Sequence, residues 1–180
     1  DTPALIVDLD AFEANVAHMA AHVKQAGIRL RPHAKTHKCA VIGQRQMAAG
    51  AVGVCCQKVS EALTLVENGV DNVLVSNQVV GPRKIEMLAE LAGKARIGVC
   101  VDHPENVETL NAAAAKAAST LHVLVEIDVG ANRCGVSPGA AAVDLARRVD
   151  AMSHLHFEGL QAYQGRAQHL RTYEERRAAI

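Results

Sequence analysis

Short apolar stretches alternate along the chain with longer stretches of helical period. The apolar stretches have the length of strands and cover residues 4–10, 28–35, 51–57, 73–76, 97–101, 123–129 and 157–163. The segments between them favour helices. The clearest are 11–25, where Phe12, Val16 and Met19 recur at helical spacing, and the Ala-rich 104–118. Strands that alternate with helices at this spacing predict βαβ units and a parallel sheet.

This alternation leaves two architectures open, an open doubly wound sheet and a closed barrel. The GxGxxG motif of dinucleotide-binding open sheets is absent after the first strand, which favours the barrel. No Pro/Ser-rich linker or low-complexity segment divides the chain, and 180 residues fit a single domain. The pattern therefore predicts one α/β domain.

Polar side chains collect on one face of three predicted strands. Arg29, Arg31, His33 and Lys35 alternate with apolar residues, so these four basic groups share a face of their strand. Such a face must meet counter-charges, water or an anionic ligand, because burying an unpaired charge is costly. Two later strands carry polar pairs toward their carboxyl ends: Glu126 with Asp128, and Gln161 with Tyr163. Active sites of α/β barrels lie at these ends.

Charge and cysteine content narrow the class of protein. Lys and Arg total 19 and Asp and Glu total 19, so nothing indicates nucleic acid or a membrane surface as a partner. We expect no membrane insertion, since no long uninterrupted apolar run is present. The five cysteines form no CxxC pair, and a reducing, cytoplasmic compartment is expected.

Three motifs in order carry a family resemblance. They are residues 31–38 (RPHAKTHK), 126–136 (EIDVGANRCGV) and 159–169 (GLQAYQGRAQH), and the opening Asp1-Thr2-Pro3-Ala4-Leu5 also fits. The chain resembles the D-threonine aldolase, D-3-hydroxyaspartate aldolase and D-serine dehydratase family. These are fold-type III pyridoxal-phosphate enzymes related to alanine racemase. The resemblance implies a TIM-type (β/α)8 barrel.

The same resemblance implies roles for five residues. Lys35 would form the Schiff base with pyridoxal 5'-phosphate (PLP), and Arg133 would contact the phenolic oxygen of its ring. Tyr163 would stack on the ring, and Gln57 would face the cofactor. His169 would take the proton of the substrate's β-hydroxyl. Each of three assignments has a purely structural alternative. Arg133 could be a turn residue, Tyr163 a core aromatic, and His169 an exposed residue at the start of a helix.

Further residues are candidates for the substrate. Arg166 would pair with the extra carboxylate of 3-hydroxyaspartate, and Arg31 and His33 are candidate substrate contacts. A divalent metal, Mg or Mn, is expected from the family, with no metal ligand in this chain. His33 and His37 are not predicted to bind a metal, since a strand that runs into a turn gives their imidazoles a poor geometry.

The resemblance implies a PLP-dependent lyase, an aldolase that cleaves the Cα–Cβ bond of D-β-hydroxy amino acids. D-3-hydroxyaspartate or D-threonine would give glycine plus glyoxylate or acetaldehyde. β-Elimination of the D-serine dehydratase type, proton transfer as in a racemase, and a non-catalytic PLP carrier stay open. A homodimer is expected.

The domain prediction divides the chain at residue 10. Residues 1–10 would be a strand of a β-rich C-terminal domain that is missing here, and 11–180 a partial alanine-racemase-like barrel. Counting from residue 28 gives about six of the eight strands of a full barrel. We therefore expect the chain to be part of a longer polypeptide.

Overall fold

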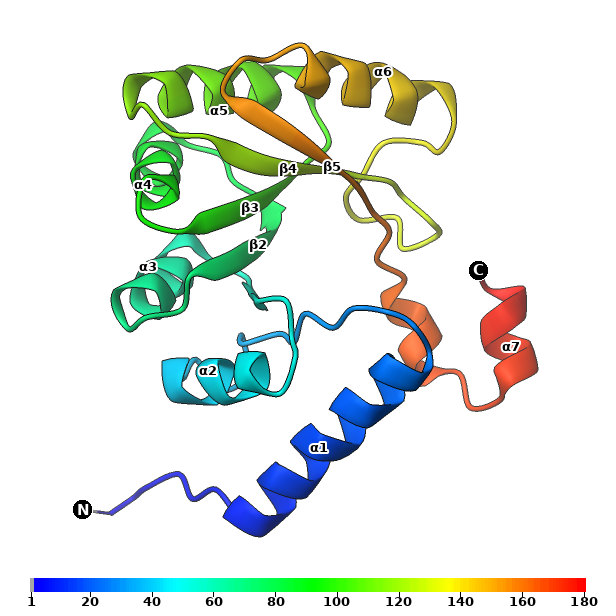
Figure 1. The fold of residues 1–180 in the computed structure, drawn as a ribbon. Coiled ribbons are helices and arrows are strands. Elements are labelled where there is room, and N and C mark those ends of the chain that lie inside the picture. The colour runs from blue at the N-terminus through cyan, green and yellow to red at the C-terminus, as the bar shows by residue number, and fades with distance from the viewer. Residues whose placement is uncertain (1) are drawn as a thin grey trace.

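Five parallel strands follow one another across a single sheet (Figure 1). They are β1 (Val54–Cys56), β2 (Asn72–Gln78), β3 (Arg96–Val101), β4 (Leu121–Glu126) and β5 (Leu155–Gln161). The structure is a computed structural model that describes residues 2–180, so Asp1 of the opening motif lies outside the described residues. Strand order equals sequence order and every pairing is parallel, without the reversal of a doubly wound sheet. The sheet is thus part of a barrel wall, as predicted.

The first predicted barrel strand adds a sixth position beside β1. The amides of Val52 and Cys55 donate to the carbonyls of Leu30 (2.9 Å) and Pro32 (2.8 Å), and Ala34 N donates to Cys55 O (2.6 Å). A parallel bridge joins His33 to Cys55. Pro32 has no N–H to donate, which keeps this ladder short. The strand is therefore shorter than the predicted 28–35.

Helices cover the outer face of the sheet. They are α3 (Val59–Glu67), α4 (Pro82–Ala92), α5 (Pro104–Lys116) and α6 (Ala140–Asp150), each placed between two strands (Figure 1). The strand residues that face them are fully buried: Val73, Val75, Ile97, Val99, Val101, Val123 and Val125. This apolar layer between sheet and helices is the core. The remaining helices are α1 (Leu9–Gln25), α2 (Ala40–Ala48), the 3-10 helix η1 (Gly165–His169) and α7 (Tyr173–Ala178).

The inner face of the sheet is arranged in layers. Asn72 pairs with Arg96 at the amino ends of their strands. One layer further along the strands, Leu74, Gly98, His122 and His156 are in register from strand to strand. The carboxyl ends of the same strands form the opposite rim, and the segments that follow them carry the candidate site.

The predicted strand at residues 4–10 is not formed. Residues 4–8 have no strand partner, and Leu9 already lies in α1, whose first turn is capped by Asp8 Oδ1 accepting from Ala11 N at 3.0 Å. A strand needs a neighbour to bond its backbone, and no segment of the described chain lies beside residues 4–8. Leu5 and Ile6 are 102% and 92% exposed. The first helix thus begins at Leu9 rather than residue 11, while the assignment of residues 1–10 to a second domain stays a prediction.

Among residues 2–180, no helix combines the length and the apolar character needed to span a bilayer. The five cysteines are all free thiols.

Candidate active site

Four predicted site residues follow strands at the carboxyl rim of the sheet. Lys35 comes directly after the segment beside β1, and Gln57 comes directly after β1 itself. Arg133 lies in the loop after β4, and Tyr163 lies two residues after β5. Because parallel strands end at the same edge of a sheet, the fold brings these residues to one rim.

A histidine holds the turn that carries Lys35. The backbone amide of Lys35 donates to His33 Nδ1 at 3.2 Å, and His33 Nε2 lies 3.3 Å from Ser76 Oγ. Because Nδ1 accepts, a neutral ring carries its proton on Nε2, toward Ser76. Burial, followed by the charge of Lys35, holds the pKa of His33 below its usual value. The neutral ring therefore keeps the turn in place, while the Lys35 side chain is exposed.

Backbone bonds close the loop that carries Arg133. Asp128 N donates to Val136 O, and Val136 N donates to Glu126 O, both at 2.9 Å. Asp128 Oδ1 also accepts from the amides of Gly130 (2.9 Å) and Asn132 (3.0 Å). These bonds, that of Asn132 first, hold the pKa of the Asp128 carboxyl below its usual value. The loop 129–135 is thus a closed turn that stands on the end of β4.

A second strand anchors the same loop. Gly135 N donates to Asp102 Oδ2 at 2.9 Å, and Asp102 directly follows β3. Gly135 has φ +104°, and a Cβ there would lie 2.6 Å from Asp128 N. Only glycine fits this position without a shift of the backbone. Asp102 was not among the predicted residues, although a polar residue that ends an apolar strand was the available signal.

Arg133 and Tyr163 meet across the rim. The guanidinium carbon of Arg133 lies 5.0 Å from the centre of the Tyr163 ring, a cation–π distance. Both line a cavity of about 360 Å³, together with Gly130, Ala131, Asn132, Gly165 and Arg166. On the other side, Arg133 Nη2 lies 3.8 Å from Glu126 Oε1. The sequence pattern places Glu126 on the polar face of its strand, but no role was predicted for this residue.

The two remaining candidates of the third motif lie on η1. Arg166 lines the cavity, and His169, the last residue of η1, is exposed. Gln168, its neighbour, donates to Tyr163 Oη at 2.9 Å. This contact ties the end of η1 to the ring that borders the cavity.

Arg31 lies at the opposite end of the sheet. Its guanidinium donates to Asn72 Oδ1 at 2.9 Å, near the start of β2. It lines a cavity of about 590 Å³ with Arg29, Arg96 and His122. The structure therefore does not bring Arg31 together with Lys35, although the sequence pattern places both on the same face of one short segment.

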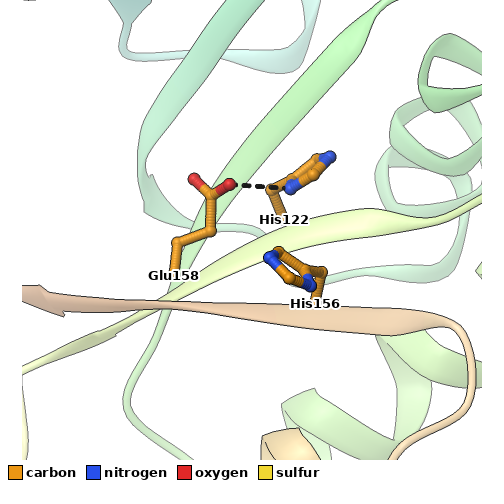
Figure 2. Close-up of side chains that lie close together, drawn as sticks. All are labelled: His122, His156 and Glu158. Atoms are coloured by element: carbon orange, nitrogen blue, oxygen red, sulfur yellow. Dashed lines mark ion pairs between the residues drawn. The ribbon is translucent and has the colours of Figure 1, made fainter.

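A cluster inside the barrel wall has the composition of a metal site (Figure 2). His122, His156 and Glu158 place ligand atoms within 4.8 Å of one another, and His122 Nδ1 lies 2.8 Å from Glu158 Oε1. Arg96, however, is paired with Glu158 and contacts His122 Nε2 at 3.2 Å. Because guanidinium only donates, it occupies the lone pair of Nε2, and the proton of the neutral ring sits on Nδ1.

The protonation of His122 agrees with this arrangement. Burial, Arg96 and His156 lower the pKa of His122 to about 4, so its ring is neutral near pH 7. A cation would have to displace the Arg96 guanidinium from both partners. The cluster is therefore an ion-paired network, and it does not fit Mg²⁺, which prefers oxygen ligands.

Comparison with known proteins identifies the family. The family model described as alanine racemase, N-terminal domain, matches residues 7–180. The chain belongs to the alanine racemase N-terminal domain family. This is the fold-type III pyridoxal-phosphate class that the three motifs indicated, so that prediction is confirmed.

Several members of the alanine racemase N-terminal domain family are similar over nearly the whole chain. A D-threonine aldolase of Arthrobacter sp is 49% identical over 98% of this chain and 46% of its own length. A 3-hydroxy-D-aspartate aldolase of Paracoccus denitrificans (strain Pd 1222) is 46% identical over 99% and 47%. The crystal structure of D-threonine aldolase from Filomicrobium marinum superposes with a TM-score of 0.96 at 56% identity, over 99% of this chain and 48% of that one. The chain thus spans about half the length of these relatives.

Proposed function

We propose that the protein containing this chain is a PLP-dependent aldolase that cleaves the Cα–Cβ bond of D-β-hydroxy amino acids. D-Threonine would give glycine and acetaldehyde, and D-3-hydroxyaspartate would give glycine and glyoxylate. One observation carries the proposal: an exposed lysine follows the first strand position at the rim where Arg133 and Tyr163 border a cavity. The similarity to two kinds of D-specific aldolase supports the reaction and the substrate class.

The residues of the rim fit PLP. The side chain of Arg133 is 56% exposed, and within residues 2–180 its guanidinium donates no hydrogen bond, so its donors are available to an anionic ring oxygen. Tyr163 offers an aromatic face beside it, and Lys35 offers the amine that binds the cofactor's aldehyde carbon. Gln57 is half-buried at the same rim. When bound, PLP withdraws electrons from the bond that breaks.

The third motif supplies the acid–base chemistry and the substrate contacts. His169 takes the β-hydroxyl proton on an imidazole nitrogen, and its position at the end of η1 leaves the ring exposed for that contact. Arg166 lines the same cavity as Arg133 and can pair with the second carboxylate of 3-hydroxyaspartate. His33 holds the backbone of Lys35, as its 3.2 Å bond indicates, rather than the substrate.

Three properties of the whole protein complete the proposal. It uses a divalent metal, Mg or Mn, with ligands from residues outside this chain, because the Arg96 guanidinium already pairs with the cluster of His122 and Glu158. It acts as a homodimer. It resides in the cytoplasm, in keeping with five free thiols.

An assay of the full-length protein tests the proposal. Aldehyde release from D-threonine and D-3-hydroxyaspartate is measured beside ammonia release from D-serine, each with PLP and Mn²⁺ and again after removal of metal with EDTA. We expect aldehyde release that falls when the metal is removed. Ammonia release without aldehyde would favour β-elimination, and bound PLP without any turnover would favour a carrier protein.

A further inference from the structure

Glu126 is a buried carboxylate directly beneath the candidate cofactor site. It is the last residue of β4, its side chain is 5% exposed, and it points to the inner face of the sheet. Its backbone carbonyl accepts from Val136, so the residue also forms the base of the loop 129–135. A buried carboxylate is costly unless charges or hydrogen bonds compensate it. The partners of this group therefore indicate what it does.

The two oxygens of Glu126 have different partners. Oε2 accepts from Gln78 Nε2 at 2.7 Å, and Gln78 is the last residue of β2. Oε1 lies 3.8 Å from Arg133 Nη2. The amide thus fixes the plane of the carboxylate, and the free oxygen is left to attract the guanidinium. Within residues 2–180, Arg133 is the cation paired with this carboxylate.

The guanidinium of Arg133 is consequently held from two sides. Glu126 attracts it from below, and the face of Tyr163 lies 5.0 Å away on another strand end. Without the carboxylate, the exposed end of this side chain would have only the aromatic face to limit its rotamers. An arginine contributes orientation only where its planar fork is fixed.

We propose that Glu126 is a positioning residue that sets the place of Arg133 and partly offsets its charge at the cofactor ring, with Gln78 orienting the carboxylate. This inference rests on the proposed function for its link to PLP. Glu126 acts through Arg133 and does not itself contact the cofactor. Replacement by Gln keeps the shape of the side chain and removes its charge. Glu126→Gln therefore separates the effect of the charge from the effect of the shape.

A double-mutant cycle in the full-length protein tests this role. Affinity for PLP is measured by titrating the apo-protein in four forms: the parent, Glu126→Gln, Arg133→Met, and the pair. We expect Glu126→Gln to weaken PLP binding about tenfold in the parent, the size of a misplaced bond to a charged group, and much less in the Arg133→Met background. The visible circular dichroism of bound PLP should also change in Glu126→Gln. If the double variant loses PLP affinity by the product of the two single losses, the two residues act independently and the inference is overturned.

Controls separate positioning from a loss of structure and from failure of the proposed function. Glu158→Gln removes another carboxylate of the inner face, and it should leave PLP affinity unchanged. Glu126→Asp keeps the charge and should restore part of the affinity. The crystal structure of apo Glu126→Gln provides a readout independent of PLP, with Arg133 expected to leave its present place beside residue 126. An unmoved Arg133 would refute the inference, whereas a parent protein that binds no PLP would refute the proposed function alone.

Discussion

Replacing Asp102 by Ala should weaken PLP binding while leaving the core intact. The change removes the oxygen that accepts from Gly135 N at 2.9 Å, and with it the bond that ties the Arg133 loop to the end of β3. The loop keeps its bonds to Asp128 and Val136. Arg133 would then sit on a loop held at the end of β4 and, through Gln164 Nε2 donating to Val129 O at 2.7 Å, at the segment after β5, and its ordered position would be populated less.

The magnitude follows from the type of bond. A hydrogen bond to a charged group is worth about 1.5–3 kcal/mol, and Asp102 is half-buried, so water replaces part of the loss. We expect about 1–2 kcal/mol, equivalent to a roughly fivefold to thirtyfold lower affinity if only the ordered loop binds PLP. The bonds of Asp128, Val136 and Gln164 to the loop survive the substitution, so we expect a value near the lower end.

Titration of the apo-protein with PLP, beside urea unfolding, checks this reasoning. Asp102→Asn keeps an acceptor oxygen and should lose less affinity than Asp102→Ala. Gly135→Ala should lose at least as much, because its Cβ would lie 2.6 Å from Asp128 N. Equal PLP affinities for the parent, Asp102→Ala and Gly135→Ala would show that the loop does not position Arg133. A large drop in the urea midpoint of Asp102→Ala would show that the bond stabilises the folded core instead of positioning the loop.

Three further predictions concern other residues. Lys35→Ala should lose the visible absorbance of bound PLP and nearly all turnover, and a borohydride-reducible linkage at another lysine would contradict the assignment. His169→Ala should slow cleavage of D-threonine by about a hundredfold to ten-thousandfold while PLP stays bound; unchanged kinetics would remove this residue from the mechanism. Stability should fall as the pH drops from about 6.5 to about 4, since burial and Arg96 lower the pKa of His122 to about 4 and only the unfolded chain takes up the proton in that window. His122→Gln should flatten the dependence of the urea midpoint on pH, and an unchanged slope would refute this cause.

Several features could be predicted from the sequence because neighbouring residues decide them. The alternation of apolar strands with Ala-rich helices predicted the parallel sheet, and its strands β1 to β5 lie within a few residues of the expected bounds. The helix predicted for 104–118 is α5, Pro104–Lys116. The motifs around Lys35, Arg133 and Tyr163 likewise predicted the family, since each is a continuous segment.

Other features depended on partners far away in the sequence. Residues 4–10 have the pattern of a strand, but a strand requires a neighbouring backbone, and the described chain offers none. Arg31 and Lys35 alternate on one segment, yet a strand rises about 3.3 Å per residue, which places Arg31 beside Asn72 at the amino ends and Lys35 at the other rim.

The contact between Gln78 and Glu126 joins residues 48 positions apart, and no local pattern could predict it. The sequence by itself therefore determined the kinds of elements and the chemical groups that follow each strand, because period and turn composition act over a few residues. Only the tertiary structure decided which of those groups meet. The register between parallel strands, set by the packing of the valine-rich outer face against the helices, brings Gln78 to Glu126 and leaves Arg133 between that carboxylate and Tyr163.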